Sequence, residues 1–532
     1  MTFLIEYTVL VHKWQYAMTK RLKEIYPGAR FIAMINAADP QAIESYLTRE
    51  GIRYEEIIDI KDYWSRFAEE KEIDPDLIHR FEETLPGKSL WRLVAIDRDW
   101  GSAFVKTAIR TLTHINTINN QENILRTCQH LIKFYQRLFD KYRPDVVLPS
   151  NGMNNLNCAI MEQFAKNYQA HYLVPETIRA LGYISFATTK EQNFPHIYPQ
   201  YLKLLETPGA DISVGEQMYD EMMEDLRKEE YYDKLTLKKF RGTAKMKYLL
   251  KVPYQAFRAV VGWVKMRPGR SAANTIFKYN RDLKTLWSIV KYEALRPYQV
   301  MTLMEPKFFS PFDPDKKYVY FPLSSTPEHS TQVKAPMWIN QLFIIEALAK
   351  SIPSDWVIYV KEHPQNLICR LRDFRFYKEL KSYPNVRLII TDTNFFDVIK
   401  KAQLIINITG TTGWQAIQFN KPVISLGENF YDMLGLSLRL TDIEQFARGI
   451  HEAIDLANSV SLPERRRRMA CLLTALRKHS FQVDHPWKLM GDIVADDKDS
   501  RIIGEAVADC MHSFLSDEDY RLRARSPMEQ TV

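Results

Sequence analysis

Two groups of polar residues follow apolar, strand-like runs in the second half of the chain, and both have the chemistry of an anion site. The first is the turn Thr409–Gly413, which comes after Leu404-Ile-Ile-Asn-Ile and before a helix-compatible segment that begins at Trp414. Glycines permit tight turns, N–H groups at a helix N-terminus attract phosphate, and threonine hydroxyls add donors. The predicted anion-binding residues of this turn are Thr409, Gly410, Thr411, Thr412 and Gly413. The alternative, which the residues leave open, is an ordinary helix N-cap.

The second group is Lys361-Glu362-His363, which follows the apolar run Trp356–Val360 and precedes Pro364. A proline ends the strand in a turn, and a histidine there can hydrogen-bond or pair with a phosphate or a sugar hydroxyl. Lys361 and Glu362 are predicted to lie beside it in the same site. The alternative is a structural histidine, with Glu362 paired to Lys361 or to a nearby arginine.

Asp97-Arg98-Asp99 has the Asp-X-Asp spelling with which some sugar-transferring enzymes hold a metal ion. No other acid or histidine stands at metal-ligand spacing around it, so a salt-bridged loop is favoured over a metal site. No metal cofactor is therefore expected, and Asp97 is kept as a candidate acid or base.

Both polar groups belong to a series of strand-like runs that alternate with helix-compatible segments along most of the chain. This pattern is typical of βα units in parallel sheets, whose ligands bind at the carboxyl ends of the strands. In the second half, such runs start at Tyr318, Trp356, Val386, Leu404 and Lys421. In the first half, strands are expected at 3–11, 30–35, 93–97, 144–150 and 171–176, and helices at 40–50 and 122–141.

Composition describes a well-cored chain and excludes several classes of protein. Of the 532 residues, 46% are apolar and 26% are charged, which is typical of a globular protein of several domains. The five cysteines are scattered without a Cys-X-X-Cys pair, so buried reduced thiols are expected. The N-terminus lacks a basic leader, and no apolar run reaches the ~20 residues that span a bilayer. A cytoplasmic location is therefore expected.

The segment from Lys234 to Arg296 carries most of the positive charge. It holds sixteen Lys and Arg against Asp282 and Glu293, a balance of +14, so the remaining chain carries 7 − 14 = −7. Aromatic and apolar residues alternate with cations from Tyr254 onward, as in amphipathic helices that lie in a membrane interface. An anionic membrane surface is the favoured partner, a plain helical linker is the alternative, and no motif supports a nucleic acid partner.

The predicted architecture is α/β, with two Rossmann-like domains that face one another across a cleft and a basic helical insertion between them. The first domain is placed at residues 1–204 and the insertion at 205–300. The second domain is placed at 301–455, and C-terminal helices with a polar tail are placed at 456–532.

Five stretches of the second domain together resemble bacterial capsule polysaccharide and surface-carbohydrate biosynthesis proteins, which are GT-B-like glycosyltransferases, some of them related to Kdo transferases. These stretches are Phe321–Ser330, Tyr359–Pro364, Asn385–Ile389, Thr409–Ile417 and Lys421–Gly427. The resemblance covers about residues 316–435, is fainter at Asn151-Gly152 and Glu176, and does not extend to the basic segment.

The resemblance implies metal-independent transfer of a sugar from a nucleotide-sugar donor, such as a CMP-linked sugar, to a glycan or lipid-linked acceptor. On the donor side, His363 would contact the phosphate or ribose of the nucleotide. The Thr409–Gly413 turn would cradle the phosphate, and Glu328 would touch the nucleotide or the sugar.

On the acceptor side, the resemblance implies that Asn151 and Gly152 line the cleft and that Glu176 is the catalytic acid or base. Many relatives carry glutamate where this chain has Gln415, so a charged role at that position is not carried over. Two rival hypotheses remain. One is a nucleotide-sugar 2-epimerase or a polyol-phosphate transferase on the same fold, and the other is a non-catalytic scaffold that binds nucleotide-sugar or polymer.

Overall fold

The computed structural model describes most of both predicted α/β domains. The described residues are 1–8, 11–37, 40–48, 52–60, 70, 72–97, 101, 121–149, 155–178, 182–189, 194, 197–227, 254, 257, 261, 305–326, 328–363, 366, 372, 374–391, 393–478, 480–482 and 496–517. The predicted site residues Asn151 and Gly152 lie outside them, as do Asp99 and nearly all of the basic segment.

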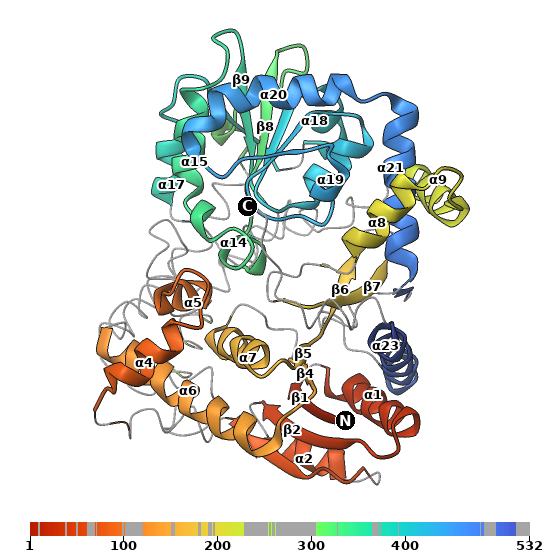
Figure 1. Ribbon diagram of the computed structural model, residues 1–532. Coiled ribbons are helices and arrows are strands. Elements are labelled where there is room, and N and C mark those ends of the chain that lie inside the picture. The colour runs from red at the N-terminus through yellow and green to blue at the C-terminus, as the bar shows by residue number, and fades with distance from the viewer. Residues whose placement is uncertain are drawn as a thin grey trace.

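The first α/β unit is built on a five-stranded parallel sheet with the order β3-β2-β1-β4-β5. The strands are β1 (Thr2–Thr8), β2 (Arg30–Asn36), β3 (Glu56–Asp59), β4 (Val146–Leu148) and β5 (His171–Tyr172). Alternate residues of β1 face opposite cores. One core lies under α1 (His12–Ile25) and α2 (Pro40–Thr48), and the other lies under α6 (Gln121–Tyr142) and α7 (Leu156–Asn167) (Figure 1).

The second α/β unit has six parallel strands in the order β10-β9-β8-β11-β12-β13. The strands are β8 (Tyr318–Pro322), β9 (Val357–Lys361), β10 (Val386–Ile389), β11 (Leu404–Asn407), β12 (Val423–Ser425) and β13 (Leu438–Arg439). The chain runs outward from β8 in one direction and then returns to continue from β11 in the other. The direction of the strand order therefore reverses between β8 and β11, which is where doubly wound sheets bind their ligands.

Helices cover both faces of the second sheet. One face packs on α15 (Gln341–Ala349), α17 (Phe374–Leu380) and α20 (Phe446–Ser459), and the other packs on α18 (Phe395–Lys401) and α19 (Thr411–Gln418). The burial of both faces explains why these strands read as continuous apolar runs in the sequence. With the first unit, this confirms the predicted α/β class with two Rossmann-like parallel sheets.

A small antiparallel sheet, which the sequence pattern did not predict, lies between the two units (Figure 1). Its strands are β6 (Val174–Ile178), β7 (Tyr183–Ala187) and β14 (Phe481–Gln482). Beside it, α21 (Leu462–Lys478) packs against α8 (Ile197–Glu206) and α9 (Ser213–Arg227), where Arg466 binds both carboxylate oxygens of Asp220 at 2.8 Å. The chain that follows the second unit therefore contributes β14 to this small sheet, beside the first unit.

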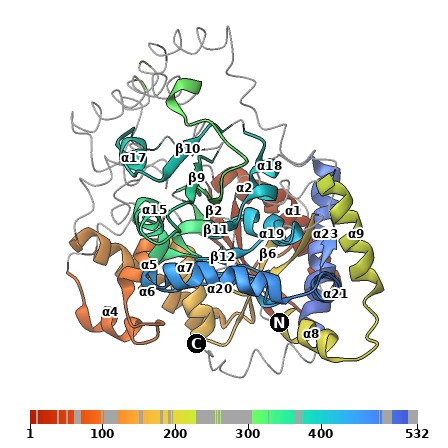
Figure 2. The ribbon, with the colours of Figure 1, turned by 90° about the horizontal axis from the view of Figure 1, so that it is seen from above.

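The C-terminal helix α23 (Asp497–Ser516) completes the first unit rather than the second, as the red and dark blue helices of Figures 1 and 2 show. It lies along α1, and its Ile503, Val507 and Met511 belong to the core under α1. A side chain at Gly504 would collide with the backbone of Trp14, so glycine allows the close approach of the two helices. The first unit is thus closed by residues from both ends of the chain.

One expected strand is wrong. Residues 93–97 do not form a strand, because α5 (Leu90–Ile96) occupies this stretch. Leu90, Leu93 and Val94 are all buried and stand at the i, i+3, i+4 spacing of a helix, whereas Arg92 between them is exposed. The expected strands at 3–11 and 30–35 are confirmed within one to three residues by β1 and β2, and both expected helices are confirmed by α2 and α6.

Three further observations hold for the described residues. Cys128, Cys158, Cys471 and Cys510 are buried free thiols, as predicted, while Cys369 lies outside the description. No described helix combines the length and the apolarity that crossing a membrane requires. No three described His, Cys, Asp or Glu side chains form a group that would hold a metal ion.

Candidate functional site

Three loops leave the carboxyl ends of neighbouring strands at the point where the strand order of the second sheet reverses. They follow β8, β9 and β11, and β8 lies between the other two strands. The backbone N–H of Leu323 donates to the carbonyl of Lys361 at 2.9 Å, so the β8 and β9 loops leave the sheet side by side. Parallel pairing therefore brings the Lys361–His363 group and the Thr409–Gly413 turn to the same edge.

The loop after β8 is fixed by the buried amide of Gln341, at the start of α15. Its Oε1 accepts from the Ser324 backbone at 2.9 Å, and its Nε2 donates to the Ser324 carbonyl and to Thr326 Oγ1, both at 3.0 Å. Thr331 Oγ1 donates to the carbonyl of Ser325 at 3.3 Å and ties the loop to the next helix. The loop is thus held by side chains that the sequence analysis did not single out.

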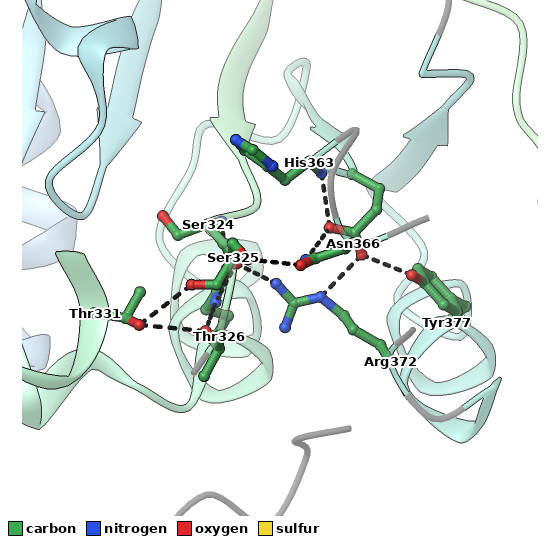
Figure 3. A network of polar contacts seen from close by, with 10 residues as sticks. Ser324, Ser325, Thr326, Thr331, His363, Asn366, Arg372 and Tyr377 are labelled. Carbon is green, nitrogen blue, oxygen red and sulfur yellow. Dashed lines mark hydrogen bonds and ion pairs between the residues drawn. The ribbon is translucent and has the colours of Figure 1, made fainter. Parts of the chain in front are cut away.

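Glu362 lies at the centre of a buried polar network (Figure 3) and is only 2% exposed. Its Oε1 accepts from the His363 backbone at 2.7 Å and from Asn366 Nδ2 at 2.8 Å. Its Oε2 accepts from Arg372 Nε at 2.8 Å and from the Tyr377 hydroxyl at 2.6 Å. Four donors occupy this carboxylate, so Glu362 orders the site from within instead of facing a ligand, and it pairs with an arginine as the alternative interpretation had it.

Arg372 extends the network to the neighbouring loop. Its guanidinium is 3% exposed and donates a short hydrogen bond to the carbonyl of Ser324. Asn366 in turn accepts from Ser325 Oγ at 2.8 Å. The β8 and β9 loops are therefore joined through one buried ion pair, and their relative position depends on it.

His363 is held by its backbone and not by its ring in this network. Its N–H is bound to Glu362, and in Figure 3 its imidazole points away from Asn366 and Arg372. The side chain is half-buried. The backbone hydrogen bond therefore fixes the position of the His363 Cα, and the ring lies at the edge where the strands end. A histidine that contacts a ligand at this edge needs both.

Lys361 lies on the opposite face of the sheet from Glu362, because successive residues of a strand alternate in direction. It is 8% exposed, its Nζ donates to the carbonyl of Thr393 at 2.6 Å, and it lies 6.0 Å from the ring centre of Phe395. Burial disfavours the charged ammonium and lowers the pKa of Lys361 from 10.5 to about 8. Burying this charge lowers the stability of the fold, so a buried lysine here suggests that its charge serves the site.

Lys361→Met is expected to stabilise the folded protein at pH 7 by up to roughly 3 kcal/mol, because the lowered pKa of Lys361 measures the cost of burying its charge. Below about pH 8 the folded and unfolded chains both carry the proton, and the full cost applies. Between about pH 8 and 10.5 only the unfolded chain keeps the proton, so wild-type stability rises with pH. The gain from the substitution should fall to about 1.4 kcal/mol at pH 9.5.

Urea unfolding of wild type and Lys361→Met at pH 7 and pH 9.5 measures this difference. Lys316→Met removes an exposed lysine and should leave the midpoint unchanged at both pH values. An equal gain from Lys361→Met at the two pH values would show that charge burial is not its cause.

The Thr409–Gly413 turn joins β11 to α19, as predicted. The Gly410 N–H donates to Asn407 Oδ1 at 2.6 Å, and α19 begins at Thr411 with Gly410 as its N-cap residue. Thr409 and Thr412 are nearly buried and Thr411 is half-buried. The Thr409 hydroxyl is already used, since it donates to the carbonyl of Ser330 at 2.5 Å.

Gly413 is required by packing. A Cβ there would collide with the hydroxyl of Tyr431 and with the amide of Asn407, and these two side chains are themselves 3.1 Å apart. The Tyr431 hydroxyl also donates to the carbonyl of Gly410 at 3.4 Å. The loop after β12 therefore backs the turn, which holds the first N–H groups of α19 in place.

Glu328 is the residue that precedes α14 (His329–Gln332), the short helix after β8. Its carbonyl accepts from Thr331 Oγ1 at 3.1 Å, and its carboxylate makes no capping bond to the helix. The residue is half-buried, at the edge where the three loops meet. Glu328 thus lies where contact with a nucleotide or sugar was predicted, and its ligand role stays a prediction.

The other two predicted catalytic residues lie outside the second sheet. Glu176 lies within β6, opposite Ser185 of β7, and is 5% exposed. Asp97 ends α5 and is 5% exposed, and its Oδ2 accepts from the N–H of Leu156 at the start of α7 at 2.7 Å. The carboxylate of Asp97 is therefore used within the fold, where it binds the first N–H of α7 beside the N-cap residue Asn155.

Comparison with known proteins relates the second unit to one family. Residues 316–454 match the family model described as capsule polysaccharide biosynthesis protein. Protein FixF of Sinorhizobium fredii is 23% identical over 233 residues, which are 40% of this chain and 53% of that protein. The chain thus spans about half the length of this curated relative.

Solved structures are similar at low identity. A β-Kdo 2,7 transferase, KpsC of Thermosulfurimonas dismutans, is 14% identical with a TM-score of 0.28, covering 64% of this chain and 80% of that one. UDP-GlcNAc 2-epimerase from Neisseria meningitidis is 12% identical with a TM-score of 0.25, covering 96% of this chain and 100% of that one. The matched family segment contains all three strand-end loops, from β8 to the turn before α19. Residues 316–454 of the chain are therefore similar to the family described as capsule polysaccharide biosynthesis protein.

Proposed function

We propose that this protein is a glycosyltransferase of bacterial surface or capsular polysaccharide assembly, which moves a sugar from a nucleotide-sugar donor to a glycan or lipid-linked acceptor. The observation that carries the proposal is the edge where the β8, β9 and β11 loops meet. His363, Lys361 and the N-terminus of α19 all belong to that edge, and all three favour an anion.

In the proposed donor half, protein groups meet the charge of the leaving phosphate. The N–H groups at Thr411 and Thr412 and the hydroxyl of Thr411 receive phosphate oxygens, while His363 and Lys361 supply positive charge. Donors fixed before the reaction stabilise developing charge without reorganising, and one such donor is typically worth about 10²–10³ in rate. The order of the site supports this role, because Glu362 and Tyr431 hold the two loops in place.

In the proposed acceptor half, Glu176 takes the proton of the acceptor hydroxyl. The bond between the anomeric carbon and the phosphate oxygen breaks, a bond from that carbon to the acceptor oxygen forms, and the nucleotide leaves as an anion. Asn151 and Gly152 are proposed to line this half, since they precede the N-terminus of α7. Glu176 is 5% exposed, so its carboxylate is largely shielded from water.

A nucleotide panel tests the proposal. CMP, CDP and UDP are compared by thermal shift, because a ligand that binds only the folded chain raises its stability by RT ln(1 + [L]/Kd). The sugar-linked form of the nucleotide that binds is then offered with a polysaccharide acceptor, and Glu176→Gln should keep nucleotide binding while it loses transfer. Product analysis separates transfer from 2-epimerisation and from polyol-phosphate transfer. Binding without any turnover would indicate a scaffold, and no binding at all would end the proposal.

We further propose that the basic segment 234–296 binds an anionic membrane surface. Support comes from its charge balance and from Tyr254 and Phe257, which are 59% and 64% exposed. Each cation near an anionic leaflet contributes about 1 kcal/mol, and exposed aromatic rings suit the interface.

Neutralising five cations of this segment is expected to release the protein from phosphatidylglycerol-containing vesicles in a flotation assay. The substituted residues are Lys238, Lys239, Arg241, Lys245 and Lys247. The matched control neutralises five exposed lysines elsewhere, namely Lys88, Lys141, Lys316, Lys350 and Lys401, and should leave flotation unchanged. Wild-type protein that fails to float at low salt would leave the segment a helical linker.

A further inference from the structure

A hydrogen-bonded path crosses from the second α/β unit to the first at α14. The side chain of Gln332, the last residue of α14, donates from Nε2 to the carbonyl of Asp97 at 3.2 Å. The carboxylate of the same Asp97 accepts from the N–H of Leu156, the first residue of α7, at 2.7 Å. In Figure 1, α14 is the part of the second unit that lies above α5 and α7.

The other end of this path reaches the predicted anion turn. Two residues before Gln332, the carbonyl of Ser330 accepts from Thr409 Oγ1 at 2.5 Å. The four residues of α14 are thus bound on one side to the turn that precedes α19 and on the other to Asp97. The carboxylate of Asp97 accepts the first N–H of α7, next to the N-cap residue Asn155, whose side chain accepts from Cys158 at 2.7 Å. Three hydrogen bonds therefore connect Thr409 with the first residue of α7.

The bridge contributes little to stability. Gln332 is 0% exposed, and its Oε1 is buried without a hydrogen-bond partner in the described part of the chain. The gain from one hydrogen bond at Nε2 is offset by the cost of burying the Oε1 oxygen without a partner. An apolar side chain of the same size would avoid that cost. The Gln332 hydrogen bond is accordingly weak on balance, and a change at α14 can alter it.

We propose that Gln332 is a positioning residue that couples occupancy of the Thr409–Gly413 turn to the placement of the α7 N-terminus. The inference rests on the proposed function, in which the turn holds the donor phosphate and the chain before α7 lines the acceptor half. An anion at the turn changes the surroundings of Thr409 and thereby of α14. The Gln332 contact passes this change to Asp97, whose carboxylate holds the N–H of Leu156 at the start of α7.

Hydrogen exchange on the full-length protein tests the coupling. The amides of Leu156 and Cys158 are followed with and without CMP, CDP and UDP at saturating concentration. The Kd of each nucleotide is measured by calorimetry on the same samples. Allosteric coupling of the usual size predicts that the nucleotide slows exchange at these amides by about fivefold or more in the wild type. Gln332→Met should abolish this slowing and leave the nucleotide Kd within about twofold of wild type.

Gln418→Met is the matched control. Gln418 is also buried, donates from Nε2 to Met222 Sδ at 2.7 Å and has an Oε1 without a partner among the described residues, but it contacts α9 instead of the first unit. This variant should keep the nucleotide effect at α7. Asp97→Ala removes the hydrogen bond at the other end of the path and should also abolish the slowing of exchange at α7. The test therefore still works if one of the two variants does not fold.

The outcomes separate this inference from the proposed function. Nucleotide binding with unchanged exchange at α7 in the wild type would overturn the coupling and leave the donor site standing. Full slowing in Gln332→Met would overturn the role of that residue. Failure of CMP, CDP and UDP alike to bind would overturn the coupling and the proposed function together.

Discussion

Glu362→Ala is expected to destabilise the second α/β unit by about 3–5 kcal/mol, because it leaves the buried guanidinium of Arg372 without its counter-charge. The same substitution removes the acceptor of the His363 N–H, of Asn366 and of Tyr377. The urea midpoint of the second unit should fall accordingly, and transfer activity should fall with it because the strand-end loops lose their common anchor.

A double variant distinguishes the lost charge pair from lost packing. Glu362→Leu combined with Arg372→Met removes both charges, and a buried ion pair replaced by well-packed apolar residues often costs little. Most of the stability should therefore return, while His363 still lacks its backbone acceptor and activity stays low. A loss below about 1 kcal/mol in Glu362→Ala would show that water or another cation already balances the pair.

The strands of the second sheet were predictable because burial on both faces makes them continuous apolar runs. The runs predicted to start at Tyr318, Trp356, Val386 and Leu404 are confirmed to within one residue as β8, β9, β10 and β11. The prediction of a strand at 93–97 was wrong for a related reason. A short apolar run fits a strand or a buried helix, and only the spacing of apolar residues that begins at Leu90 indicates the helix.

The small antiparallel sheet and the packing of the C-terminal helix could not be predicted from the sequence, for a different reason. β14 has two residues, and its partner β7 lies about three hundred residues earlier in the chain. The pairing of α23 with α1 likewise depends on contacts between the two ends of the sequence, such as that of Gly504 with Trp14. No local pattern records such long-range packing.

The candidate site divides in the same way. Lys361, His363 and the Thr409–Gly413 turn could be predicted because they follow strands, and parallel pairing alone places the ends of these strands at one edge. The residues that order this edge could not be found, since Gln341, Arg372 and Tyr431 lie on helices and loops with no chemical signature of their own. Their role arises only from burial, which a sequence pattern does not display.

His363→Ala is expected to lower the rate of sugar transfer by about 10²–10³ without changing the fold, because it removes one fixed group that faces the leaving phosphate. The backbone of His363 supports this separation of effects. Its N–H, and not its ring, is bound to Glu362, so the loop keeps its anchor when the imidazole is removed. Thermal unfolding should therefore stay at the wild-type midpoint while kcat falls with the nucleotide-sugar identified by the panel.

Two further variants define what the imidazole contributes. His451→Ala removes an exposed histidine of α20 and should leave both rate and stability unchanged. His363→Gln keeps a hydrogen-bond donor but cannot carry a charge, so recovery of most of the rate would assign His363 a hydrogen bond to the donor. A loss as large as in His363→Ala would assign it a charge instead. Wild-type turnover in His363→Ala would remove this residue from the site, and with it the argument that places the leaving phosphate at the end of β9.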